Sequence, residues 1–243
     1  MLRPHGLPAI HWHERQAFVI GITAAAGWLD ALAFLHLGKV FNSIMTGNVL
    51  FVGLGAGNAD GGLVLRAGVA LAAFALAAFV GARIVGPELT TGAAAERLTR
   101  ALLIEGALLV AFAMIWLAIG SPADHPALRV VLLGVGATAM GVQAAIALAL
   151  KMPNIATVAL TGTIAQLAAL AGWRRRHDVI PRDVPSLALM AALILTYLVG
   201  AAIVALAPDW PALALGPIVL LGVATIGRLT PGKDRRHPIQ SPA

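Results

Sequence analysis

Apolar residues run through this 243-residue chain in long stretches, and short segments with polar residues, glycine or proline separate them. A helix needs about 20 consecutive apolar residues to cross the hydrocarbon core of a bilayer. Six stretches reach that length and predict spanning helices, at residues 17–37, 62–85, 101–120, 127–149, 185–207 and 211–228. The pattern therefore predicts an all-α fold, a polytopic membrane helix bundle.

Two further apolar stretches, 40–57 and 153–172, are broken by glycine and small polar residues. Broken helices at matching places in two halves of a membrane protein are typical of a central pathway. The residues of these segments that we take as candidate pathway residues are Asn42, Ser43, Thr46, Gly47, Asn48, Asn154, Thr161, Gly162 and Thr163.

The positions of Lys and Arg favour one arrangement of the two broken segments. If both segments re-enter and the N-terminus is cytoplasmic, fourteen of the seventeen basic residues face the cytoplasm, and only Lys39, Arg66 and Arg129 face outward. If all eight stretches span, the ratio falls to twelve against five. Because basic residues concentrate in cytoplasmic loops, the count favours re-entrance, and both arrangements place the two termini in the cytoplasm.

Re-entrance gives each half three spans, so the second half enters from the opposite side and the halves form an inverted repeat. We predict repeat one at 17–120 and repeat two at 127–228, within one membrane domain at 17–228. Cytoplasmic tails are expected at 1–16 and 229–243, the second of them disordered. If every stretch spans, the repeat is parallel instead.

Composition narrows the classes of function. The chain is 59% apolar and 12% charged, about half the charge of a soluble domain, and its mean hydropathy is +0.87. It has no cysteine, which excludes disulfides and thiolate catalysis. The net charge of +6 does not indicate nucleic acid, because the basic residues flank the apolar stretches. The expected partner is the lipid bilayer.

Enzyme motifs are absent from the sequence. It contains no Gly-x-Ser-x-Gly elbow, no His-Glu-x-x-His helix and no Walker loop. We therefore expect a protein without enzymatic activity, and we expect no cofactor and no metal.

Asp30, Glu105 and Gln143 are polar side chains inside predicted spans. A carboxylate as deep as Asp30 is a candidate functional residue by default. Alternatively, it accepts N–H bonds from the neighbouring broken segment or pairs with Lys39. Gln143 occupies the corresponding region of the second half. Glu105 is expected to reach the interface or to pair with an arginine just before it.

The first broken segment also suggests a ligand. A half-helix starting near Thr46 and Gly47 would direct free N–H groups toward the midplane, which suits a small anion or a neutral polar solute. Asn48, Thr161 and Thr163 would add neutral hydrogen-bonding groups. The alternative is that these small residues only allow close helix packing.

The first half resembles the opening of the YoaK-like family of bacterial membrane proteins. The matching residues are Gly27–Leu35, Gly38, Val40, Phe41 and Met45–Asn48. Trp28 stands where the family typically has tyrosine, while Gln143 and Leu160–Thr163 are similar to later family elements. The resemblance covers essentially the whole chain and implies a multi-spanning protein of the bacterial inner membrane, without implying an activity.

We therefore expect a small-solute transporter or channel. Its pathway would pass between the two Thr-Gly segments, with Asp30 as a coupling or gating group. The main alternative is a non-transporting scaffold or accessory subunit, which predicts a dry centre and a fully paired Asp30. A membrane-embedded enzyme is a further alternative that lacks a visible nucleophile or metal cluster. Small-residue helix faces would permit a homo-oligomer.

Overall fold

The computed structural model describes residues 12–86, 92–120, 122–150, 187–206 and 216–221, with isolated positions between 162 and 169. Every regular element in these parts of the chain is a helix. Five helices are long and apolar enough to cross a membrane: α1 Trp12–His36, α3 Gly61–Val85, α4 Gly92–Ile119, α5 Pro126–Ala149 and α7 Leu187–Leu206. The prediction of a polytopic helix bundle is confirmed, and the sixth predicted span is helical where it is described, at 216–221.

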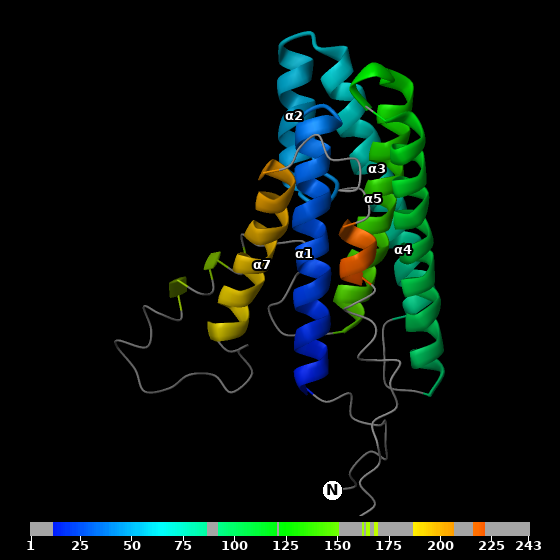
Figure 1. Ribbon diagram of the computed structural model, residues 1–243, viewed down its shortest axis with the longest axis vertical. Helices are drawn as coiled ribbons and strands as arrows, with labels where there is room; N and C mark the ends of the chain where they lie inside the picture. The colour runs from blue at the N-terminus through cyan, green and yellow to red at the C-terminus, as the bar shows by residue number, and fades with distance from the viewer. Residues whose placement is uncertain are drawn as a thin grey trace, which may run out of the picture.

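The bundle consists of two groups of helices, α1 with α7 and α5 with α3 and α4. In Figure 1, α7 lies on one side of α1, and α3, α4 and α5 lie on the other. α1 packs mainly on α7, and α5 packs mainly on α3 and α4, so that α1 and α5 touch each other only slightly. The short helix 216–221 fills the space between α1 and α4, because Gly216 packs on the Trp28 ring and Leu221 packs beside Gly106.

The first broken segment forms a short apolar helix. Its helix α2 (Met45–Gly57) has 13 residues, which at the helical rise is about 20 Å and too short to span. Residues 37–44 fold back alongside α1, α2 then rises above the end of α1, and a turn at 58–60 leads into the descending α3 (Figure 1). The chain therefore enters and leaves this segment at the same end of the bundle, as a re-entrant segment would.

Glycines set the distance between α1 and α7. A Cβ atom at Gly27 would stand 2.4 Å from the carbonyl oxygen of Tyr197, and one at Gly200 would stand 2.5 Å from the carbonyl oxygen of Ala24. Both distances are shorter than van der Waals contact allows. The two backbones therefore meet directly, as small residues permit inside membranes.

Glycines also allow close contact between α3 and α5. A Cβ atom at Gly141 would stand 2.4 Å from the carbonyl oxygen of Phe74, and one at Gly81 would stand 2.9 Å from the Cβ of Ala145. Each of the two most extensive helix pairs in the described structure thus crosses at a glycine from each partner.

Two helices begin earlier than the hydropathy pattern predicts. α1 starts at Trp12, inside the expected tail 1–16. α4 starts at Gly92, nine residues before the expected 101, because the Arg100 Nη2 donates to Glu96 Oε1 at 2.6 Å and supports a polar helical turn outside the apolar stretch. The longer α4 places Glu105 at the middle of the helix.

The two predicted halves meet at a tight turn. Gly120 ends α4 with a φ of 70°, a conformation that favours glycine. A short 3-10 helix, Pro122–Asp124, follows, and Pro126 opens α5 at a position where proline is tolerated. The second predicted broken segment, 153–172, lies outside the described residues except for isolated positions.

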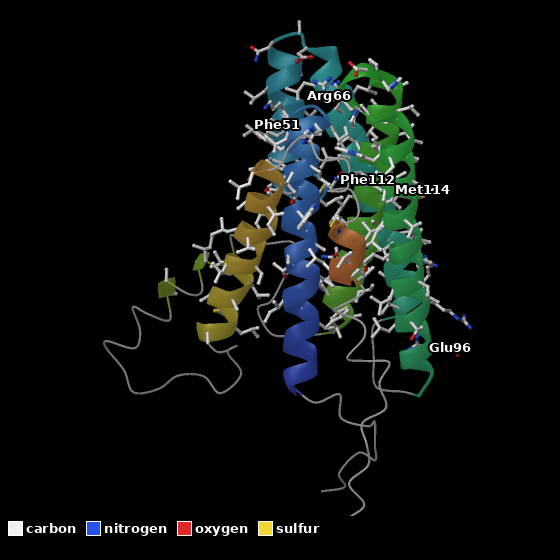
Figure 2. The ribbon with its side chains drawn as sticks, viewed as in Figure 1. Phe51, Arg66, Glu96, Phe112 and Met114 are labelled. Atoms are coloured by element: carbon white, nitrogen blue, oxygen red, sulfur yellow. The ribbon has the colours of Figure 1, made fainter. Side chains whose placement is uncertain are left out.

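Re-entrance can be measured by thiol accessibility in this cysteine-free chain. Lys39→Cys and Asn58→Cys, both at exposed positions on either side of the dip, should react with a membrane-impermeant maleimide from the same side of sealed vesicles. Glu96→Cys is the control and should react only from the opposite side, since Arg66 and Glu96 lie at opposite ends of the bundle (Figure 2). Labelling of positions 39 and 58 from opposite sides would contradict the re-entrant fold.

Candidate functional site

Asp30 lies at the point where α1, the re-entrant segment and α7 meet. One carboxylate oxygen, Oδ1, accepts the backbone N–H groups of Asn42 and Ser43, each at 2.7 Å. The other, Oδ2, accepts the Ser43 hydroxyl and the Tyr197 hydroxyl, the latter at 2.7 Å. Asp30 is 2% exposed. A carboxylate with four donors is matched to its ionised form, since that form only accepts hydrogen bonds.

These bonds define the depth of the dip. Asp30 precedes the last residue of α1 by six positions, or about 9 Å along the helix. The backbone of residues 42 and 43 therefore returns about one and a half turns into the bundle. Of the two structural roles that the sequence suggested for Asp30, the structure shows the first, while the Lys39 ammonium lies 4.9 Å from the centroid of the Phe34 ring.

Asn48 closes the re-entrant loop on itself. Its Oδ1 accepts the N–H of Phe41 at 2.9 Å, and its Nδ2 donates to the carbonyl of Phe41 at 2.7 Å. Phe41 lies between α1 and α2, and neither helix bonds its backbone. The Asn48 side chain bonds the Phe41 N–H and carbonyl instead. Since the buried Asn48 amide is occupied on both sides, its contacts are those of a loop-stabilising residue.

Phe41 explains the glycine in the Thr-Gly-Asn motif. Its ring stacks between Phe34 and Phe51, with centroid distances of 5.4 and 5.8 Å. A Cβ atom at Gly47 would stand 2.9 Å from the Phe41 ring. Gly47 is therefore required for packing, while its neighbour Thr46 is exposed on the outside of α2.

The start of α2 does not present a row of free amides. The N–H of Met45 donates to the Ser43 carbonyl at 3.0 Å, and those of Gly47 and Asn48 donate to the Ile44 carbonyl at 3.1 and 3.3 Å. The half-helix begins where the sequence predicts, but its first turn bonds to the backbone just before it. Three of the first four amides of α2 are therefore already bonded, which leaves few donors for an anion.

Two carboxamides face the seam between α1 and α5. Asn42 Nδ2 donates to the Leu29 carbonyl at 3.3 Å, and Gln143 Nε2 donates to the Ile22 carbonyl at 3.0 Å. Both side chains are fully buried. The remaining oxygens, Asn42 Oδ1 and Gln143 Oε1, have no hydrogen-bond partner among the described residues.

Each carboxamide lies between α1 and α5, and the two are about two helical turns apart. Asn42 lies against Gly136 of α5, where a Cβ would stand 2.7 Å from its amide nitrogen. Gly136 and Gln143 are seven residues apart on α5, and their α1 counterparts Leu29 and Ile22 are also seven apart. Seven residues are about two helical turns, or 10.5 Å. The seam thus carries two buried carbonyl oxygens at different depths.

The predicted site residues of the second half are only partly described. Gly162 is helical and exposed, and no described atom lies within 4 Å of the place of its Cβ. Asn154, Thr161 and Thr163 lie outside the described residues. The structure brings Asp30, Asn42 and Ser43 together, and it leaves Thr46 on the opposite surface of α2.

Glu105 differs from its sequence interpretation. It neither reaches the interface nor pairs with an arginine, because it is buried and both of its oxygens lack a hydrogen-bond partner among the described residues. Arg97 instead donates its Nε to the Val85 carbonyl at 3.1 Å, and Arg100 pairs with Glu96. The physical reason is the early start of α4, which moves Glu105 away from the helix end.

Two residues that the site needs are not among the candidates named from the sequence. Tyr197 bonds to Asp30 from a helix 167 positions later in the chain, and Gly136 makes room for the Asn42 amide. The signal for Tyr197 was its position as the only tyrosine of the chain, in the middle of an apolar helix. A hydroxyl there needs a partner.

Comparisons with known proteins agree with this architecture. The family described as protein of unknown function (DUF1275) matches residues 18–227. The chain is also similar to the UPF0700 transmembrane protein YoaK of Bacillus subtilis (strain 168), with 32% identity over 203 residues that cover 81% of this chain and 86% of the relative. No solved structure matches the chain.

The bond between Asp30 and Tyr197 can be tested by a double-mutant cycle. A hydrogen bond to a charged group contributes about 1.5–3 kcal/mol, so Tyr197→Phe should lower the free energy of unfolding by that amount. Asp30→Asn should lower it by roughly 2–4 kcal/mol, because it removes the charge and one acceptor. The double variant should lose less than the sum, since the two share one bond.

Unfolding in mixed micelles, followed by tryptophan fluorescence, measures these differences. Thr196→Val is the matched control, because the Thr196 hydroxyl donates only within its own helix, to the Ala192 and Leu193 carbonyls at 2.9 and 3.1 Å. Strictly additive effects of the Asp30 and Tyr197 variants would show that the bond is not formed in the membrane protein.

Proposed function

This chain belongs to the DUF1275 family, proteins of unknown function with transmembrane members, and we propose that it is a transporter or channel for a small polar solute. The pathway runs along the seam between α1 and α5. The protein resides in the bacterial inner membrane with both termini in the cytoplasm, as its basic residues indicate.

The observation that carries the proposal is the pair of unpartnered carbonyl oxygens at Asn42 and Gln143. Leaving a buried polar atom without a partner costs about 1–3 kcal/mol. A purely structural seam would be filled more stably by apolar side chains of the same size. A solute that donates hydrogen bonds would satisfy each oxygen in turn as it passes.

The same oxygens indicate the chemistry of the solute. They accept hydrogen bonds, and the amides at the start of α2 are already bonded to backbone carbonyls. The seam therefore favours a neutral solute with hydroxyl or amide donors over the small anion that the sequence also allowed. Within the described seam no side chain supplies a positive charge to hold an anion.

An inverted repeat supports a pathway at this place. α1 ascends while α5 descends, and α3 descends while α7 ascends (Figure 1). If α1 corresponds to α5 and α3 to α7, the pair α1 and α7 corresponds to the pair α5 and α3, and each pair has a glycine on both helices where they cross. The pseudo-symmetry axis then lies between α1 and α5, where transporters of this kind bind their substrate.

Both oxygens of Asp30 already accept hydrogen bonds from the protein, so in this proposal Asp30 positions other residues and does not bind the solute. It holds the re-entrant backbone at the depth where the Asn42 amide faces α5. Full pairing of Asp30 is also what the scaffold alternative predicts. The unpartnered oxygens distinguish the two, because a scaffold gains nothing from them.

Solute flux through proteoliposomes tests the function. Light scattering after an osmotic challenge with urea, glycerol or sodium chloride reports the permeability for each probe. We expect the protein to raise the permeability of urea or glycerol above that of empty liposomes, and not that of sodium chloride. Gln143→Leu should reduce the increase by about five- to 150-fold, because it removes an acceptor worth about 1–3 kcal/mol to a donor solute.

The control is Thr138→Val, which removes a hydroxyl from the same helix that bonds only to the Gly134 carbonyl at 2.7 Å. This variant should keep the permeability of the unmodified protein. If none of the three probes crosses faster than through empty liposomes, the donor-solute proposal is wrong. If Gln143→Leu matches Thr138→Val, the seam is not the pathway.

A further inference from the structure

Glu105 is the least compensated group in the described structure. It is 0% exposed, and neither carboxyl oxygen has a hydrogen-bond partner among the described residues. It stands at the middle of the 28-residue helix α4. It shares a buried stripe with Ala101, Leu109 and Phe112, one or two turns away on the same face.

The helices around α4 offer no charge to balance it. α4 packs on α5, on α3 and on the short helix 216–221. Residues 130–149 of α5, residues 67–82 of α3 and residues 216–221 contain no titratable side chain. The neighbourhood that the structure describes is therefore apolar at the depth of Glu105.

The charged residues of these elements lie nearer their ends and have other contacts. Arg83 stacks on the Phe79 ring at 4.9 Å, and Arg129 donates to the Pro122 carbonyl at 3.3 Å. On α4 itself, Arg97 donates to a carbonyl of α3 and Arg100 pairs with Glu96.

α1 reaches α4 through His36, which packs edge-on against Trp116. Trp116 is eleven residues from Glu105, or about 16 Å along α4. The other carboxylate at membrane depth, Asp30, is held by its own four donors.

The contrast between the two buried carboxyls separates their roles. Asp30 accepts four hydrogen bonds, which compensate a negative charge. Glu105 has none, and an isolated ionised carboxylate in such surroundings is so costly that the group takes up a proton instead. A neutral carboxylic acid, by contrast, can remain in an apolar helix interface.

We propose that Glu105 is a proton-binding site inside the membrane. Its carboxylic acid holds a proton while it is buried among α3, α4, α5 and helix 216–221. When water reaches the acid, the proton passes to a water molecule, which gives a carboxylate and a hydronium ion. The carboxylate takes up a proton again when it is once more shielded from water. The site does not depend on the solute pathway, since it lies on α4, away from the seam.

Infrared spectroscopy of the full chain in lipid nanodiscs at neutral pH tests the proposal. We expect a carbonyl stretching band of a protonated carboxylic acid that shifts in heavy water. Glu105→Gln should remove the band. Glu96→Gln is the control and should leave the band unchanged, because the Glu96 carboxylate is exposed and pairs with Arg100 at 2.6 Å.

A chemical probe covers the case in which Glu105→Gln fails to fold. The apolar reagent dicyclohexylcarbodiimide adds a protonated carboxyl across one of its C=N bonds, and the adduct rearranges to a stable N-acylurea without a leaving group. Mass spectrometry of the unmodified protein should locate this adduct at Glu105 and not at Asp30.

Three results would overturn the proposal. The first is a protein with neither the carbonyl band nor an adduct at Glu105, which would mean that the residue is ionised and paired. The second is a band that persists in Glu105→Gln. The third is a band that does not shift in heavy water, because a proton that never exchanges is not a bound ligand.

Discussion

A carboxylate within a membrane is costly unless donors surround it, and Asp30 obtains its donors by drawing the backbone of Asn42 and Ser43 back into the bundle. The same bonds also stabilise the broken segment, because its backbone amides need hydrogen-bond acceptors where water is scarce. The Tyr197 hydroxyl completes the set and ties α7 to the same point. These hydrogen bonds to Asp30 hold residues 42 and 43 beside α1, and they thereby set where α2 begins.

The position of the re-entrant backbone determines what the centre of the protein presents. Because residues 42 and 43 are fixed, the Asn42 amide lies against Gly136 and directs an unpartnered oxygen into the seam that also holds Gln143. The flanking pairs, α1 with α7 and α3 with α5, are held at backbone contact by glycines. α1 and α5 themselves touch little. A bundle built of two tight pairs with a polar seam between them can change that seam without breaking either pair.

The sequence predicted the features that depend on local pattern and missed those that depend on distant contacts. Apolar stretches were sufficient to locate the five long helices and to predict a helix bundle. The broken-segment pattern made Asn48 and Gly47 candidate pathway residues but did not show that both contact Phe41, whose ring stacks with those of Phe34 and Phe51. Glu105 was misjudged for a related reason. The apolar pattern shows where a helix enters the membrane, and not where the helix begins in water.

Hydrogen–deuterium exchange of the re-entrant segment, measured by mass spectrometry in nanodiscs, tests most directly whether Asp30 holds this fold. The account predicts that the amides of residues 41–44 are protected in the unmodified protein, and that Asp30→Ala makes them exchange at least tenfold faster while α3 and α5 stay protected. Equal protection of residues 41–44 in the two proteins would contradict it, because the segment would then be held in the bundle by something other than the Asp30 carboxylate.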